Sequence, residues 1–537
     1  MPSTGVVCII GANNSGKSRL LRDVSILLKD GSDEVPIVLR SLEVEKPLQT
    51  QITEAGGGVD QFGYLDETYK EIVKTWLKGN SGGQGTDYQG NLCFTATGTG
   101  VSHTPFSRLV QYFQNERLSS EVYPFFVNEV LHPSASLNHS LSAEGGNSEL
   151  EGSYLAMLSR WGDTERRFSQ IFERVFGQKL MFDRFTGFQG MRLGEAPKNP
   201  YDEYGRPLNS SVEFVRELPK LQSQGNGIQH FMGPLCALQL GNAGIVLLDE
   251  PETYLHPPQA KELGKIVGES SVERDKQVLI ATHDKDFVAG LLESGASVLF
   301  LRVDRQGSIN PIQQVTTNDL KWLWNNPVLR YSNLLAGMFY KQVVVCEADG
   351  DCRMYNAVLD SLLEKNELDR SASQTLFLPS GGKSGVATRA QALSRLSVPT
   401  KVVLDFDVLL DEPSVLRKIV ESLQQEWTES LRNQFDTTKQ AIIDNGLNAT
   451  AKSSGLSVLP AGAATRSANE LIRTLGSMGV FIVPVGELES FNKETSREKS
   501  AWVDEQLTNK FHETNKDIRR FCKAFLELER PMIAHDD

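Results

Sequence analysis

Residues 5–18 read GVVCIIGANNSGKS, a short apolar run followed by a loop of glycine, asparagine and serine. The last eight residues fit the pattern G-x-x-x-x-G-K-[ST] at every fixed position. Glycines let the backbone wrap around a phosphate, and N–H groups at the start of the next helix then point at the anion. The pattern places the Lys17 charge at the β- and γ-phosphates of ATP and the Ser18 hydroxyl on Mg²⁺. The predicted ATP-binding residues of this loop are Gly11, Asn13, Asn14, Ser15, Gly16, Lys17 and Ser18.

Two later apolar runs end in residues that suit the same site. The run IVLLDE, residues 245–250, predicts a strand that ends in two acids. There Asp249 can hold the Mg²⁺ through water, and Glu250 can position or deprotonate the attacking water. The run QVLIATHD, residues 277–284, places His283 where it can sense the γ-phosphate. Because short apolar runs separated by helices are typical of buried parallel strands, we expect an α/β fold with helices on both faces of the sheet.

The motifs GANNSGKS, IVLLDEPETYLHP and ATHD resemble those of ABC-type ATPases of chromosome maintenance and repair, including the OLD (overcoming lysogenization defect) family. In these ATPases a signature loop from one subunit completes the ATP site of its partner, so the resemblance implies a homodimer or a higher oligomer. The segment SQGNGIQ, residues 223–229, stands where that loop is expected, although the family usually carries a tighter Leu-Ser-x-Gly core. Ser223 and Asn226, beside Gly225 and Gly227, are then the alternatives for reaching the γ-phosphate.

The first domain is expected to cover residues 1–330, with an insertion at about 45–215. Long coiled-coil relatives carry sustained heptads between the two halves of the ATP site. This insertion instead holds many Gly and Pro residues and no sustained a/d pattern, which favours a compact inserted domain that could serve dimer contacts. The glutamine of the family's Q-loop has three candidates here, Gln49, Gln51 and Gln61.

The composition of the 537-residue chain is that of an ordinary soluble globular protein, with 39% hydrophobic and 23% charged residues. No run approaches the roughly eighteen apolar residues that a membrane-spanning helix needs. Six scattered cysteines without a CxxC pair favour a reduced, cytoplasmic compartment over a disulfide framework or a zinc site. The net charge of −13 argues against a surface that is basic all over, but a local groove or bound metal ions can still offset the repulsion of nucleic acid.

A second α/β domain is expected over residues 340–537, with a helical insertion at about 411–470. Its acids follow three apolar runs in pairs: Glu347 and Asp351, Asp405 and Asp407, and Glu487 and Glu489. Parallel strands bring their carboxyl ends to one edge of a sheet, so these acids can converge. Converging carboxylates repel and are tolerated mainly where divalent cations neutralise them. Two Mg²⁺ or Mn²⁺ ions about 4 Å apart could activate water for phosphodiester cleavage.

These acids resemble the motifs of a Toprim domain, the metal-binding module of topoisomerases, primases and OLD nucleases. EADGD, residues 347–351, stands for the first motif, in which Gly is more usual at position 348, and DFD, residues 405–407, for the second. The resemblance implies that Glu347 is a metal ligand or a general base. It implies further metal ligands at Asp351, Asp405, Asp407 and Glu487, with Glu489 as an additional candidate.

A basic group would complete such a site by stabilising the leaving oxygen. In OLD nucleases a lysine follows the last acidic motif, which leaves Lys510, Lys516 and Lys523 as candidates, with Lys516 favoured. One helical face is expected to carry Lys516, Arg519, Arg520 and Lys523. This face either follows a phosphate backbone or is simply solvated. Lys383, in PSGGKSG, could also meet a phosphate.

An ABC-type ATPase followed by a Toprim domain is the layout of the OLD family. The resemblance implies an ATP-regulated, metal-dependent DNA nuclease, with a role in anti-phage defence and sometimes a helicase-like partner. Two alternatives remain open at this point. The chain could be a toxin that cuts RNA such as tRNA under the control of its ATPase, or an ATPase scaffold whose acids bind a structural metal.

Overall fold

A computed structural model gives the architecture of the chain. It describes residues 4–29, 34–39, 41–42, 70–71, 73–74, 83–86, 92–95, 103–105, 123, 127–130, 154, 158, 162–188, 190–305, 309–330, 332–445, 448–493 and 499–527. These residues fall into two compact units. The first comprises Met1–Ile10 and Gly16–Leu301, and the second comprises Gly11–Ser15 and Arg302–Asp537.

The first unit is built on a parallel sheet whose strands lie in the order β10-β1-β9-β8-β5. These strands are β1 (Gly5–Ile10), β5 (Val127–Val130), β8 (Ile245–Asp249), β9 (Gln277–Ala281) and β10 (Val298–Val303). All six residues of β1 are buried, as expected for a central strand that is covered on both faces. The register pairs Ala281 with both Ile9 and Asp249, so the ends of β1, β8 and β9 meet at one edge of the sheet.

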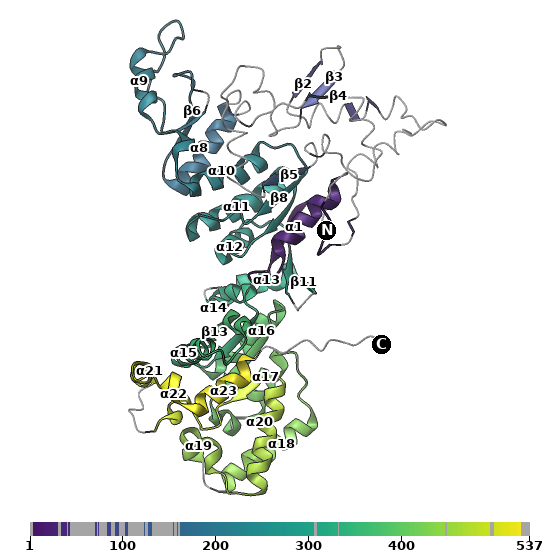
Figure 1. Ribbon diagram of the computed structural model, residues 1–537, viewed down its shortest axis with the longest axis vertical. Coiled ribbons are helices and arrows are strands. Elements are labelled where there is room, and N and C mark those ends of the chain that lie inside the picture. Colours follow the sequence, from purple (N-terminus) through teal and green to yellow (C-terminus); the bar gives the residue numbers. More distant parts are fainter. Residues whose placement is uncertain are drawn as a thin grey trace, which may run out of the picture. The chain divides into compact units, whose positions relative to one another are not determined.

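The first unit also contains α-helices. They are α1 (Lys17–Leu28), α8 (Gly162–Phe176), α9 (Asn209–Glu217), α10 (Asn226–Gln239), α11 (Pro257–Glu273) and α12 (Lys285–Glu293). Figure 1 shows α11 and α12 side by side. Their backbones approach closely because Gly264 and Gly290 have no side chain. A Cβ atom on Gly264 would lie 2.1 Å from the Phe287 carbonyl oxygen, and one on Gly290 would lie 1.9 Å from that of Lys261.

Two smaller sheets accompany the first unit. Strands β2 (Gly83–Thr86), β3 (Leu92–Thr95) and β4 (His103–Pro105) pair antiparallel within the predicted insertion. Strands β6 (Leu180–Phe182) and β7 (Met191–Leu193) form an antiparallel pair.

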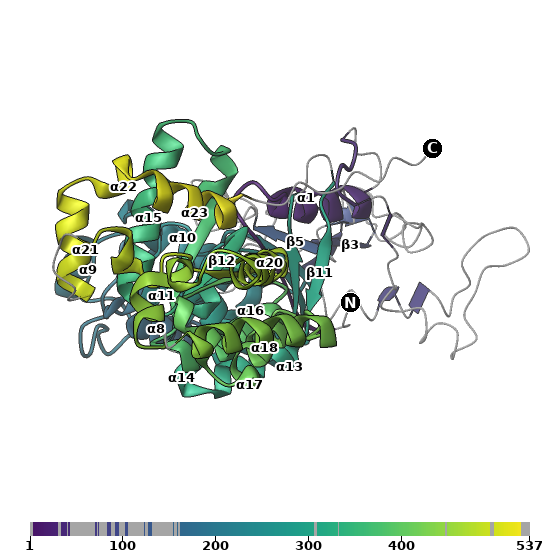
Figure 2. The same ribbon diagram turned by 90° about the horizontal axis from the view of Figure 1, so that it is seen from below.

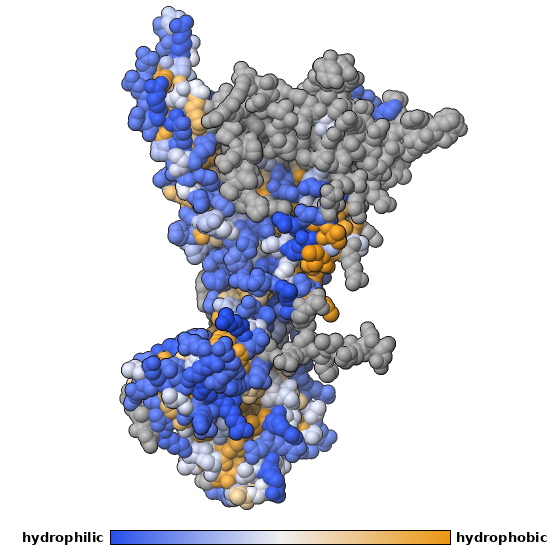
Figure 3. Space-filling model, in the orientation of Figure 1, coloured by the Kyte–Doolittle hydropathy of each residue, from blue (hydrophilic) through white to orange (hydrophobic). Residues whose placement is uncertain are grey.

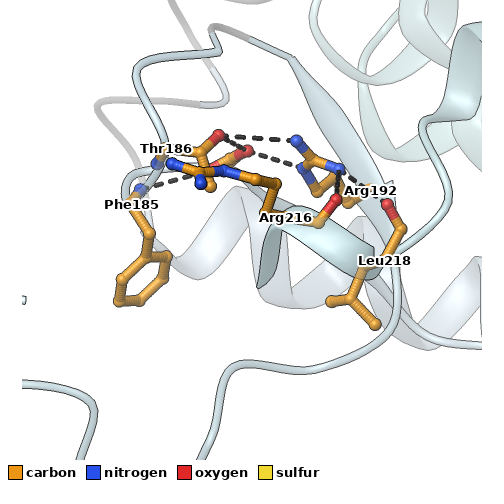
Figure 4. Close-up of polar contacts among 6 residues, drawn as sticks. Phe185, Thr186, Arg192, Arg216 and Leu218 are labelled. Atoms are coloured by element: carbon orange, nitrogen blue, oxygen red, sulfur yellow. Dashed lines mark hydrogen bonds and ion pairs between the residues drawn. The ribbon is translucent and has the colours of Figure 1, made fainter. Parts of the chain in front are cut away.

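A buried ion pair fixes the segment beside β6 and β7 (Figure 4). Arg192 Nε donates to Asp183 Oδ2 at 2.6 Å, and both side chains are almost wholly buried. Arg192 Nη1 also donates to the carbonyl oxygens of Arg216 and Leu218, at 3.1 and 2.6 Å. Asp183 accepts from the Thr186 backbone N–H at 3.0 Å. Such a buried pair is tolerated because hydrogen bonds satisfy both of its members.

The second unit contains a four-stranded parallel sheet in the order β13-β12-β14-β15. These strands are β12 (Gln342–Cys346), β13 (Thr375–Pro379), β14 (Thr400–Leu404) and β15 (Val480–Ile482). The remaining strand of this unit is β11 (Ile312–Val315). Its α-helices are α13 (Thr317–Asn325), α14 (Pro327–Arg330), α15 (Asp349–Glu364), α16 (Lys383–Arg395), α17 (Pro413–Ser422), α18 (Glu429–Asp444), α19 (Asn448–Ser454), α20 (Ala463–Ser477), α21 (Lys499–Thr508), α22 (Phe511–Thr514) and α23 (Lys516–Leu526).

The C-terminal helices pack on α15. Figures 1 and 2 show α15, α22 and α23 together. Their shared core buries Tyr355, Trp502 and Phe525. On the face drawn in Figure 3 the outer side of α21–α23 is mainly hydrophilic. In the chain, helices α17–α20 lie between β14 and β15.

The α/β architecture predicted from the strand pattern is confirmed by both sheets. Within the part of the chain that the structure describes, no helix is both long and apolar enough to cross a bilayer.

Candidate functional sites

The phosphate-loop segment has the predicted strand, loop and helix. β1 ends at Ile10, and α1 begins at Lys17 directly after the loop. Gly16, the residue before the helix, has φ 98°, and Asn14 has φ 63°. These values lie in the left-handed region that favours glycine and tolerates asparagine. A side chain at position 16 would therefore strain the turn that aims the first N–H groups of α1.

The predicted Mg²⁺ ligands of the ATP site meet although they lie far apart in the sequence. Ser18 Oγ donates to Asp249 Oδ1 at 2.9 Å. Asp249 is the last residue of β8, so the sheet edge carries it to the start of α1. Lys17 lies beside them and is buried. Burial lowers the pKa of Lys17, while the charges of Glu250, Glu252 and Asp249 act in the opposite direction. A hydroxyl, a carboxylate and an ammonium group are the set that holds Mg²⁺ and phosphate.

Glu250 and His283 form a pair next to this set. His283 Nδ1 lies 3.1 Å from Glu250 Oε1, and both side chains are partly exposed. The hydrogen bond to Glu250 raises the pKa of His283, and the same bond lowers the pKa of Glu250. Glu250 also has φ 45°, a left-handed value that is uncommon for a residue with a side chain and clusters at functional sites. The two residues predicted to act on water and the γ-phosphate therefore lie together.

A third carboxylate, Glu252, escaped the sequence prediction. Its Oε1 accepts hydrogen bonds from Thr282 Oγ1 at 2.6 Å and from the His283 backbone N–H at 3.2 Å. Its Oε2 is buried and has no hydrogen-bond partner among the described residues. Burial raises the pKa of Glu252 to about 7. The signal was available in the repeated acid of Asp249-Glu250-Pro251-Glu252.

The segment predicted to be the signature loop stands at the start of α10. Asn226 is the first residue of this helix and Gly225 precedes it. Ser223, Gly225 and Asn226 are exposed. Gly227 has a steric role, because a Cβ atom there would lie 2.7 Å from the Tyr254 carbonyl oxygen. Ser223 Oγ donates to the Lys220 carbonyl oxygen at 2.7 Å. The three Q-loop candidates, Gln49, Gln51 and Gln61, lie outside the described residues.

In the second unit three of the predicted acids come together. Glu347, Asp405 and Asp407 each offer a carboxylate oxygen, and these oxygens all lie within 4.8 Å of one another. We call these three residues the acidic cluster. The parallel pairing of β12 and β14 places Glu347 and Asp405 just beyond neighbouring strand ends. The Asp405 backbone N–H also donates to Glu347 Oε1 at 2.9 Å. Convergent carboxylate oxygens are the donor set of a hard divalent cation, so these residues fit Mg²⁺ or Mn²⁺.

The other predicted acids of this unit lie around the cluster or are buried. Asp351 is buried, and its Oδ2 accepts from the Ala348 backbone N–H at 2.9 Å. Glu487 Oε2 lies 3.9 Å from Lys452 Nζ, which in turn lies 3.7 Å from Asp407 Oδ2. Lys452 therefore connects Glu487 to the cluster, and the sequence prediction did not include it. The remaining acid, Glu489, is buried, and its Oε2 has no hydrogen-bond partner among the described residues.

The basic residues differ most from expectation. Arg519 is buried and donates to Ser361 Oγ at 2.6 Å and to Glu367 Oε1 at 2.7 Å. Lys523 also pairs with Glu367, at 2.7 Å. The basic face predicted for this helix is therefore wrong, because two of its members hold α23 against neighbouring elements. Lys516 is exposed and makes no ion pair within the described ranges, so its role stays a prediction.

Two other candidate lysines have different surroundings. Lys510 lies 3.5 Å from Glu513 on the surface. Lys383 lies at the acidic cluster, with Nζ 2.8 Å from Asp407 Oδ1 and 2.8 Å from Asp411 Oδ2. Of the lysines considered from the sequence, Lys383 is thus the one whose ammonium bonds to a cluster acid.

The chain is similar to one ATPase family and to two known nucleases. The family model described as "AAA domain, putative AbiEii toxin, Type IV TA system" matches residues 209–289. The chain is 26% identical over 443 residues to the OLD nuclease of Thermus scotoductus, covering 76% of this chain and 79% of that protein. It is 19% identical over 300 residues to the Old nuclease of Escherichia phage P2, covering 53% of this chain and 49% of that protein.

A solved SMC head bound to the C-terminal winged-helix domain of ScpA covers 59% of this chain and 92% of its own, at 13% identity and a TM-score of 0.31. That score is too low for the likeness to bear on function. The two nuclease matches span most of the first relative and about half of the second, and the ATPase model coincides with α10, β8 and β9. The chain is thus similar to OLD nucleases, over 76% of its length in the first comparison, and its residues 209–289 match an AAA-domain ATPase model.

Proposed function

We propose that the protein is a divalent-metal-dependent DNA endonuclease whose activity is controlled by ATP binding and hydrolysis. The observation that carries this proposal is the convergence of Glu347, Asp405 and Asp407 within 4.8 Å, in a chain that is similar to OLD nucleases. The ATP half rests on Ser18 and Asp249, whose contact in the first unit supplies a place for Mg²⁺.

The residues of the ATP site would have different roles in binding and hydrolysing ATP. The loop from Gly11 to Ser18 would hold the phosphates through its N–H groups and through Lys17. Glu250 would position and deprotonate the attacking water, and His283 would hold Glu250 and contact the γ-phosphate. Exposed Ser223, Gly225 and Asn226 would face the ATP of a second copy, so the working unit would be at least a homodimer.

We assign the second unit to the Toprim class, on its parallel sheet with acids at the strand ends. Glu347 would be a metal ligand or the general base. Asp351, Asp405, Asp407, Glu487 and Glu489 are the further proposed ligands. Mg²⁺ or Mn²⁺ held by these carboxylates would supply an activated water and polarise the phosphate. The protein's own contribution is to hold these carboxylates in place and to supply a cation near the leaving oxygen.

The biological setting is proposed from the family. An ATP-gated nuclease of this kind would act in anti-phage defence, alone or beside a helicase-like partner. RNA is the second candidate substrate, because the family model that matches residues 209–289 is described as a putative toxin of a toxin–antitoxin system. In that reading the acids would cut an RNA such as tRNA.

One assay separates these functions. The full chain is incubated with plasmid DNA and with total RNA, each with Mg²⁺ or Mn²⁺. The proposal predicts metal-dependent nicking or cutting of the plasmid. RNA cleavage with an intact plasmid would replace DNA by RNA as the substrate. If metal-dependent cleavage persisted undiminished in Glu347→Ala, the assignment of these acids as the catalytic site would be wrong. A wild-type chain that cleaves neither DNA nor RNA would instead be an ATPase scaffold whose acids bind a structural metal.

A further inference from the structure

Lys383 is held in place by the strand end that carries Glu347. It is the first residue of α16 and follows Gly382, whose φ of 110° lies in the left-handed region. The Gly382 backbone N–H donates to the Glu347 carbonyl oxygen at 2.8 Å, and that of Ser380 donates to the Cys346 carbonyl oxygen at 2.8 Å. These two bonds attach the loop before Lys383 to the chain at Cys346 and Glu347.

The ammonium of Lys383 forms an ion pair with Asp407, a carboxylate of the proposed metal site. Its Nζ lies 2.8 Å from Asp407 Oδ1 and 2.8 Å from Asp411 Oδ2. Only 20% of the Lys383 side chain and 25% of the Asp407 side chain are exposed. Water and salt therefore screen this pair less than an ordinary surface ion pair. A divalent cation bound to the acidic cluster would have to share Asp407 with this ammonium or displace it.

We propose that Lys383 is the resident counter-cation of the acidic cluster and its phosphate-contacting group. Without metal, its ammonium offsets part of the repulsion among three convergent carboxylates. When a divalent cation takes over Asp407, Asp411 keeps the ammonium at the edge of the site. There its flexible stem lets it meet a substrate phosphate oxygen. This inference rests on the proposed metal-dependent cleavage, and it assigns to Lys383 the basic role that the sequence pattern favours for Lys516.

The surroundings of the neighbouring lysine support this choice. Lys452 lies 3.7 Å from Asp407 Oδ2, beyond hydrogen-bond distance, and 46% of its side chain is exposed. Lys383 instead bonds to both Asp407 and Asp411. The Asp411 backbone is itself held, because Lys439 Nζ donates to its carbonyl oxygen at 3.0 Å. Asp411, the second hydrogen-bond partner of Lys383, is thus held by a contact outside the acidic cluster.

Mn²⁺ binding to the full chain, measured by titration calorimetry, separates this role from a purely structural one. Lys383→Gln keeps a donor for Asp407 but removes the charge that competes with the metal. We expect Lys383→Gln to bind Mn²⁺ about tenfold more tightly than wild type. Its cleavage of plasmid at saturating Mn²⁺ should fall about a hundredfold, because a cation that faces the phosphate is lost. Lys383→Arg keeps the charge and should bind Mn²⁺ as wild type does.

The matched control is Lys418→Gln, which removes an exposed lysine on α17 that makes no ion pair in the described part of the chain. It should change neither measurement. Unchanged or weaker Mn²⁺ binding by a Lys383→Gln protein with the wild-type melting temperature would overturn the inference and leave the proposed function intact. A wild-type chain that cleaves neither DNA nor RNA would overturn the proposed function, while tighter Mn²⁺ binding by Lys383→Gln would still support the counter-cation.

Discussion

In the ATP site Asp249 and Glu250 each contact a neutral or basic side chain, whereas in the acidic cluster oxygens of three carboxylates also lie within 4.8 Å of one another. Asp249 accepts from Ser18, and Glu250 pairs with His283. In the acidic cluster the ammonium of Lys383 bonds to Asp407, and that of Lys452 lies 3.7 Å from the same acid. The first arrangement is assembled by protein contacts alone. The second remains electrostatically costly until a divalent cation binds, so metal should matter more to its geometry.

Removing a cluster acid tests the second half of this comparison and carries the largest expected effect. Glu347→Ala should lower the initial rate of metal-dependent plasmid cleavage at least about a thousandfold, because both a ligand and a candidate base are lost. ATP hydrolysis, measured by phosphate release, should stay at the wild-type rate. The control Glu364→Ala removes an exposed acid near the end of α15 and should leave both rates unchanged.

The buried Arg192–Asp183 ion pair tests whether a carboxylate with its own partners in the first unit stabilises the fold. Arg192→Met leaves Asp183 buried without its cationic partner, which should lower the free energy of unfolding by about 3–5 kcal/mol. Urea denaturation measures this. Exposed Arg206→Met should change the same free energy by less than about 0.5 kcal/mol. Equal stabilities of the two variants would show that the pair contributes nothing to the fold.

A substitution of Glu250 tests whether this residue of the ATP site is the general base of ATP hydrolysis. Glu250→Gln keeps the size of the side chain and a hydrogen-bond acceptor for His283, but it cannot take a proton. ATP hydrolysis should fall about a hundredfold or more, while equilibrium binding of ATP is retained. Hydrolysis at the wild-type rate would exclude Glu250 as the base. Loss of ATP binding would instead make it a structural residue.

The smallest effect concerns Glu252 and depends on pH. Burial raises its pKa from an ordinary value of 4.5 to about 7, so the folded chain holds a proton that the unfolded chain releases. Stability is therefore lost as pH rises through that interval, and the loss is complete above the folded pKa. Glu252→Gln should match wild type near pH 5 and exceed its unfolding free energy at pH 8 by about 1–3 kcal/mol. The same difference in unfolding free energy between Glu252→Gln and wild type at both pH values would contradict this assignment.

Much of both sites could be predicted from the sequence because their motifs are local. A strand, a glycine loop and a helix are encoded within residues 5–28, and acids at the ends of parallel strands must converge at one sheet edge. The convergence of Glu347 with Asp405 and Asp407 therefore followed from the strand pattern.

Residues whose positions depend on packing between distant elements could not be predicted in this way. Helical spacing placed Arg519 on a basic face that would either follow a phosphate backbone or be solvated. In the structure Arg519 lies next to Ile518 and Cys522 in the buried stripe of α23 and bonds to Ser361 of α15. Lys452 reaches Asp407 from a helix that the strand pattern does not position. Such contacts depend on how helices pack, which no spacing along one element reveals.

The central claim is that ATP binding controls cleavage and that the acidic cluster performs it. The most direct measurement is plasmid cleavage in Mn²⁺, with and without ATP, by wild type, Lys17→Ala and Glu347→Ala. We expect ATP to change the wild-type rate. Lys17→Ala should cleave at a rate that ATP does not change, and Glu347→Ala should not cleave under either condition. Cleavage by Glu347→Ala, or a response of Lys17→Ala to ATP equal to that of wild type, would contradict it.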